Sequence, residues 1–114
     1  MLLDELRIRA AEGTWTVLAG GAVIGESARA LELSEPALPP VLYFPSEDLA
    51  LALFDPSETV TTCPVKGAAR HFHIATPHGA ILDAGWCFEA PGPEAERIAG
   101  FIAFAGDKVT LARG

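Results

Sequence analysis

The sequence predicts a mainly β protein that folds as a single small domain over residues 1–114. Three observations predict this class: apolar stretches are short, several alternate with polar residues, and 11 Gly and 9 Pro interrupt the chain. Such a pattern is typical of many short strands joined by tight turns. A chain of 114 residues has the usual length of one domain and can bury a core without a disulfide or a metal.

The N-terminal third predicts a β-hairpin followed by a further strand. Leu6–Ala10 alternates apolar and charged residues, as a strand with one solvated face does. Thr14–Leu18 and Ala22–Ile24 are strand-like and flank a two-residue turn at Gly20-Gly21. Ala28–Leu33 is expected to continue as a strand before an ordered, Pro-rich loop at 35–40.

The middle of the chain predicts short elements broken by proline. Val41–Phe44 is expected to be a buried strand that stops at Pro45, and Ser46-Glu47-Asp48 to form a single helical turn. Leu49–Leu53 fits a strand as well as a helix. Asp55-Pro56-Ser57 is expected to form a turn, because proline cannot donate to a sheet ladder.

The C-terminal half predicts a second hairpin and one short helix. His71–Ala75 and Ala80–Leu82 flank a loop at 76–79. The helix is expected near residues 93–99, with Pro93 in its first turn and Gly100 at its end. Further short strands are expected at 59–62, 86–88, 101–104 and 109–111.

Charge and hydropathy exclude several classes of partner. The net charge of −7 argues against nucleic-acid binding, which requires a basic surface. No apolar run approaches the roughly 20 residues of a membrane span, so we expect no membrane association. Residues 1–7 lack a signal peptide's basic and apolar regions, and two cysteines without an export signal indicate a cytoplasmic protein. The sequence leaves a homo-oligomer open.

The densest group of reactive side chains is the run Thr61-Thr62-Cys63-Pro64-Val65-Lys66-Gly67. Cys63 is a candidate nucleophile, because an ammonium at Lys66 that faced the sulfur would favour the thiolate. The alternative is that Cys63 is a small buried residue that holds a turn. Burial is the favoured reading, since free cysteine is among the most buried residue types.

Metal, phosphate-loop and paired-acid sites fit the sequence poorly. His71 and His73 would share one face of a strand, but no Cys-x-x-Cys accompanies them, and we expect no metal and no cofactor. Gly20–Gly25 is a hairpin turn, because no Gly-Lys-Ser/Thr follows it. Of Glu47 and Asp48, one is expected to cap the turn after Pro45 and the other to pair with Lys66 or Arg70.

Four runs in this order resemble domain of unknown function family 427. They are Tyr43-Phe44-Pro45-x-Glu47-Asp48, Thr62-Cys63-Pro64-x-Lys66-Gly67, Trp86-x-Phe88 and Ile98-x-Gly100-Phe101-Ile102-Ala103-Phe104. The resemblance extends from about Ile8 to Val109. It implies a β-tent, or Mss4-like, architecture of two antiparallel sheets that meet over a cavity. The family also carries a nucleotidyltransferase label, but this sequence has no Asp-x-Asp pair that could hold a metal-bound triphosphate. Ala68, His71 and Ala105 depart from the family's usual residues.

We expect the protein to bind a small ligand, anionic ligands included, in a cavity beside the Cys63–Gly67 loop. The expected binding residues lie near that loop or carry polar groups that could face it: Tyr43, Asp48, Cys63, Lys66 and Trp86. Two alternatives stay open. One is a structural or protein-interaction domain without catalysis, and the other is a thiol- or nucleotide-dependent enzyme that uses Cys63 and Lys66.

Overall fold

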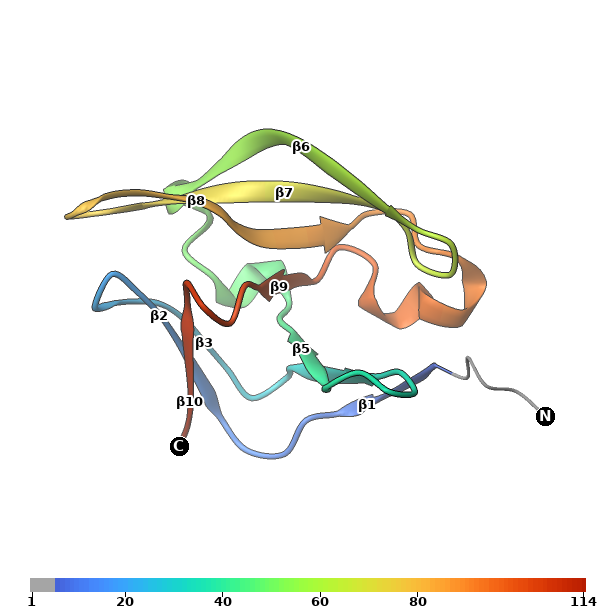
Figure 1. Cartoon of the computed structure of the whole chain (residues 1–114). Helices are drawn as coiled ribbons and strands as arrows, with labels where there is room; N and C mark the ends of the chain where they lie inside the picture. The colour runs from blue at the N-terminus through green and yellow to red at the C-terminus, as the bar shows by residue number, and fades with distance from the viewer. Residues whose placement is uncertain (1–5) are drawn as a thin grey trace.

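Ten strands in three antiparallel sheets form the structure, a computed structural model that describes residues 6–114 (Figure 1). The mainly β prediction is confirmed. The sheets number three rather than two, because the strand after Ala30 pairs with the first strand instead of extending the N-terminal hairpin. Residues 1–5 of the expected domain, and with them most of the segment examined for a signal peptide, lie outside the described residues.

Each sheet combines strands that are distant in sequence. The first has the order β1 (Arg7–Ala10), β4 (Leu31–Ser34), β5 (Val41–Tyr43). The second has the order β10 (Thr110–Arg113), β2 (Trp15–Ala19), β3 (Ala22–Ser27). The third has the order β6 (Phe54–Cys63), β7 (Gly67–Thr76), β8 (Gly79–Phe88), β9 (Ile102–Phe104). Three 3₁₀ helices complete the described chain: η1 (Ser46–Asp48), η2 (Leu51–Leu53) and η3 (Pro93–Ile98).

Both predicted hairpins are confirmed. The β2–β3 turn has Gly20 and Gly21 at φ +57° and +80°, the left-handed region that glycine adopts without steric cost. The β7–β8 hairpin turns at 77–78, and its strands extend through the separate runs expected at 71–75, 80–82 and 86–88.

The turn predicted at Asp55-Pro56-Ser57 is wrong, because these residues belong to β6. β6 is an edge strand, where proline is tolerated, and its ladder to β7 is interrupted between Pro56 and Val60. The helix expected near 93–99 is in the predicted place, but it is a 3₁₀ helix with a non-helical residue at Ala95.

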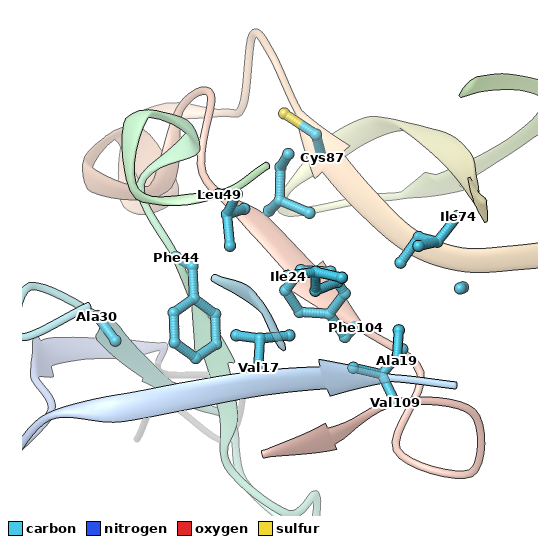
Figure 2. Close-up of a cluster of buried hydrophobic side chains, with 12 residues drawn as sticks. Val17, Ala19, Ile24, Ala30, Phe44, Leu49, Ile74, Cys87, Phe104 and Val109 are labelled. Carbon is cyan, nitrogen blue, oxygen red and sulfur yellow. The ribbon is translucent and has the colours of Figure 1, made fainter. Parts of the chain in front are cut away.

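Two hydrophobic clusters lie against the third sheet. The larger one, shown in Figure 2, brings together side chains such as Val17, Ile24, Phe44, Ile74 and Phe104. The smaller cluster contains buried residues from the first and third sheets and from η3: Leu33, Tyr43, Ala69, Phe88, Ala95, Ile98 and Ala103. Consecutive residues of β8, at 87 and 88, belong to different clusters, so both faces of β8 are buried at its C-terminal end.

A short backbone bridge joins the first and third sheets. Phe44 and Ile102 exchange two N–H···O hydrogen bonds of 2.8 Å, which place β5 next to β9, the edge strand of the third sheet (Figure 1). Over residues 6–114, no helix has the length and apolar character needed to cross a membrane.

Candidate functional site

The Cys63–Gly67 run is the turn between β6 and β7. Cys63 pairs with Gly67 across it, and the Lys66 backbone N–H donates to the Cys63 sulfur at 3.5 Å. A Cβ on Gly92 would lie 2.6 Å from the Val65 carbonyl oxygen, so the loop after β8 packs directly on this turn. Cys63 is half-buried and accepts a hydrogen bond that holds the turn together.

The Lys66 side chain turns inward rather than toward the thiol. Its ammonium forms an ion pair with Glu35 and lies 5.9 Å from the centre of the Phe88 ring. The side chains of Lys66 and Glu35 are only 13% and 21% exposed, so water screens this pair weakly. The pair fastens the β6–β7 turn to the Pro-rich loop that follows β4.

Asp48 belongs to a different group of polar residues. It accepts hydrogen bonds from Ser27 at 2.7 Å and from Arg29 at 2.8 Å, and these two donors lower the pKa of its carboxyl group. Glu47 lies 3.5 Å from the same guanidinium. The expectation that one of Glu47 and Asp48 caps the turn while the other pairs with Lys66 or Arg70 is therefore wrong. Arg29, which follows β3, pairs with both carboxylates, and no side chain caps η1.

Tyr43 and Trp86 connect the first sheet to the third. The Trp86 indole N–H donates to the Tyr43 hydroxyl at 3.3 Å, and Tyr43 is only 2% exposed. Burial raises the pKa of Tyr43 to about 12, so its hydroxyl is neutral at physiological pH. Tyr43, Cys63 and Trp86 belong to the same cluster as Phe88, on which Lys66 lies. Four of the five predicted residues thus gather, and Asp48 does not join them.

An open groove of about 620 Å³ lies beside this group, where all three sheets meet. Its walls are largely apolar, and its aromatic side chains include both tryptophans of the chain. The lining consists of Trp15, Glu32, Glu35, Leu38, Pro39, Pro40, Val41, Leu42, Trp86, Phe104, Gly106 and Leu111. Trp86 and Glu35 therefore connect the groove to Tyr43 and Lys66.

The Pro-rich loop forms one wall of this groove and carries strain. Leu38 N–H donates to the Glu35 carbonyl at 3.2 Å, closing a β-turn with Pro36 and Ala37 at its centre. Ala37 has φ +64°, a conformation that residues other than glycine adopt at a cost. Leu38, next to it, is 60% exposed on the groove wall. The loop thus holds an apolar side chain in solvent.

Comparison with protein-family models assigns this chain to a family. Residues 7–113 match the model of the family described as Domain of unknown function (DUF427). The chain belongs to this family. No curated protein matches the sequence. This DUF427 domain has three sheets where the resemblance implies two, and the rest of the β-tent assignment stays a prediction.

The sequence reasoning missed Glu35 and Trp15, which the structure places in the groove. Glu35 begins the Pro-rich segment, and a carboxylate at the start of a rigid loop could have marked it as a candidate site residue. Trp15 stands on β2, and β10, which pairs with that strand, contributes Leu111 to the same groove. No local pattern in the sequence shows that pairing.

The histidines of the DUF427 domain make contacts within the third sheet. His71 Nε2 lies 3.0 Å from the Thr61 hydroxyl, and His73 Nδ1 accepts the Asp83 backbone N–H at 3.0 Å. Within residues 6–114, no three His, Cys, Asp or Glu side chains gather closely enough to hold a metal ion. The expectation of no metal rests on the sequence, and these contacts give His71 and His73 structural partners.

Cys87 is the second thiol and lies at the edge of the larger cluster (Figure 2). It is 4% exposed, and burial raises the pKa of its thiol to about 11. The thiolate is the reactive form of cysteine, so Cys87 is protected from chemistry at neutral pH.

Proposed function

We propose that this DUF427 domain binds a small ligand in the groove between Trp15 and Trp86. One observation carries the proposal: a largely apolar groove of about 620 Å³, at the junction of three sheets, is lined by both tryptophans of the chain. Ligand sites in proteins are typically roughly 300–1,000 Å³ in volume, mostly apolar, and carry a few polar groups. The exposed Leu38 beside a strained turn supports the same conclusion.

The predicted site residues have unequal roles in this proposal. Trp86 lines the groove, while Tyr43 orients it by accepting its indole N–H. Lys66 is a positioning residue, because its ammonium holds Glu35 and with it the wall formed by residues 35–40. Cys63 shapes the turn that directs Lys66 inward. Asp48 has no part in the groove.

The test uses tryptophan fluorescence, because both tryptophans of the chain line the groove and Trp86 lines it without lining the neighbouring pocket beside Arg9 and Arg113. We expect a fragment library to contain compounds that change the emission saturably. Leu38→Ala should weaken their binding roughly five- to tenfold, since it removes apolar contact area. Leu82→Ala is the matched control, because Leu82 is 62% exposed and lies outside the groove lining.

Two results would overturn the proposal. One is a library in which no compound changes the emission at millimolar concentration. The other is binding that Leu38→Ala and Leu82→Ala weaken equally, since the ligand would then lie elsewhere.

We also propose that the protein is located in the cytoplasm, and this part of the proposal rests on the sequence alone.

A protein-interaction domain is the second candidate, and β6 favours it. This strand has ten residues, lies at the edge of the third sheet and exposes 61% of Val60. An exposed edge of this kind can pair with a strand of another chain. Val60→Lys should abolish such pairing and leave groove binding unchanged. Thiol chemistry lacks comparable support, because the Lys66 ammonium faces Glu35 rather than the Cys63 sulfur.

A further inference from the structure

The charged side chains that line the groove are both carboxylates, Glu32 and Glu35. Each uses its Oε1 atom for one cation: Arg9 Nε lies 2.8 Å from that of Glu32, and Lys66 pairs with that of Glu35. Over residues 6–114, the Oε2 atoms of these two carboxylates accept no hydrogen bond. An ionised carboxylate can accept about four hydrogen bonds, so both retain acceptor capacity.

The two tryptophans offer ring faces rather than hydrogen-bond donors. The Trp15 indole N–H donates to the Glu12 carbonyl at 2.9 Å, and the Trp86 indole N–H donates to Tyr43 at 3.3 Å. Both donors are therefore already used inside the protein. The face of an indole ring is electron-rich and attracts cations, more strongly than those of tyrosine and phenylalanine.

Lys66, Arg9 and Arg113 are cations that lie near the groove without belonging to its lining, and the two arginines line a neighbouring pocket that shares Trp15 and Glu32 with it. Lys66 is held by Glu35 over Phe88 and is not part of the lining. Arg9 is 79% exposed, and its pair with Glu32 is of the solvent-exposed kind that contributes little. A ligand cation can therefore share Glu32 at small cost. An anionic group in the groove would instead face two carboxylates.

We infer that the groove selects organic cations: an amine or quaternary ammonium carried on an apolar or aromatic body. The apolar part packs against Leu38 and Leu111, and the charged group lies near Trp15 and Glu32. The net charge of −7 raises the local concentration of cations around the protein. This inference rests on the proposed function, and it replaces the anionic ligand expected from the proximity of Lys66.

The experiment titrates the native chain with four compounds that share a phenylethyl group and differ in the polar group at its end. They are 2-phenylethylamine, phenethyltrimethylammonium, 2-phenylethanol and 3-phenylpropionate. Tryptophan fluorescence is the readout, and the indole N–H resonances of Trp15 and Trp86 confirm that the groove is occupied. We expect both cations to bind about tenfold tighter than the alcohol, which corresponds to about 1.4 kcal/mol, and the carboxylate to bind most weakly.

Two charge-matched variants separate the groove from the overall field of the protein. Glu32→Gln should reduce the preference for cations roughly fivefold, because it removes a carboxylate from the lining. Glu26→Gln removes the same charge from an exposed position on β3 outside the groove, and should leave the preference unchanged. Equal losses in the two variants would overturn the assignment to the groove.

The remaining outcomes distinguish this inference from the proposed function. If the alcohol or the carboxylate binds as tightly as the cations and shifts both indole resonances, the inference falls while ligand binding in the groove stands. If none of the four compounds shifts either resonance, and the fragment library also yields no ligand, both fall together.

Discussion

The Tyr43 hydroxyl accepts the Trp86 indole N–H at 3.3 Å, and this bond links β5 of the first sheet to β8 of the third. It orients the ring that forms part of the groove wall. Because the acceptor is 2% exposed, no water replaces it readily. The orientation of Trp86 therefore depends on the position of one buried phenol.

Tyr43 is the one tyrosine of the chain, so its ionisation can be followed by ultraviolet absorbance. Burial raises the pKa of Tyr43 from 10.0 to about 12, and we expect the native protein to show no tyrosinate signal through pH 10–11. The unfolded chain ionises first, so the free energy of unfolding falls as pH rises above 10. In urea the midpoint should return to about 10. A native midpoint at 10 would contradict the burial of this hydroxyl.

The Lys66–Glu35 ion pair should be energetically coupled. Lys66→Met and Glu35→Gln are each expected to lower the free energy of unfolding by about 2 kcal/mol, because each leaves a partly buried charge without its partner. The double variant should lose less than the sum of the single losses. Urea denaturation of all four proteins measures the coupling, and strictly additive losses would show that the two residues do not interact.

Ala37→Gly should stabilise the groove wall. Alanine at φ +64° costs about 1 kcal/mol relative to glycine, and the greater entropy of glycine in the unfolded chain offsets part of this gain. We expect a net increase of about 0.5 kcal/mol in the free energy of unfolding. Ala99→Gly is the control: Ala99 is exposed at φ −54°, so the same exchange should destabilise. A destabilised Ala37→Gly variant would exclude strain at this turn.

Gly92→Ala should loosen the contact between the loop after β8 and the Cys63–Gly67 turn. Its Cβ would lie 2.6 Å from a backbone oxygen, Val65 O, which cannot move without displacing the turn. We expect a loss of about 1–3 kcal/mol in thermal or urea unfolding. Gly106→Ala meets no atom within 4 Å and serves as the control. Equal stability of the two variants would show that the loop is not packed as described.

Cys87 should resist alkylation in the native protein. Its thiol is buried and its pKa is raised from 9.0 to about 11, so iodoacetamide at pH 8 should leave it unmodified until urea is added. As pH rises beyond 9.0 the unfolded thiol ionises first, and stability falls by up to about 1.4 kcal/mol per pH unit. Peptide mass spectrometry identifies the modified cysteine. Native modification of Cys87 would show that this part of the core opens.

Features encoded by neighbouring residues were predicted from the sequence. The glycine pair at 20–21 and the apolar runs on either side of 76–79 specify hairpins because turn and strands are adjacent in the chain. The helical turn at 46–48 is local in the same way, because it begins directly after Pro45. Pro56 was misassigned, because whether a proline ends a strand depends on whether that strand lies at a sheet edge.

The sequence predicted four residues of the candidate site but not their partners in space. Tyr43, Cys63, Lys66 and Trp86 carry recognisable chemistry, and the structure gathers them around Phe88. The partner of Lys66 is 31 residues away, on a loop whose position depends on the pairing of β4 with β1 and β5. Asp48 was placed near Lys66 because of its sequence position, whereas Arg29 is its spatial neighbour. Partners that depend on sheet order cannot be deduced from spacing.

The pairing of β10 with β2 has a consequence for how the protein folds. Thr110 lies opposite Leu18 and Arg113 opposite Trp15, so this ladder closes a loop of almost the whole described chain. Contacts of such large sequence separation form late, because their closure costs the most chain entropy. Trp15 and Leu111, which these strands place together, lie in the groove. We therefore expect the groove to be assembled at the end of folding, with Trp15 emission reaching its native value after the hairpins have formed.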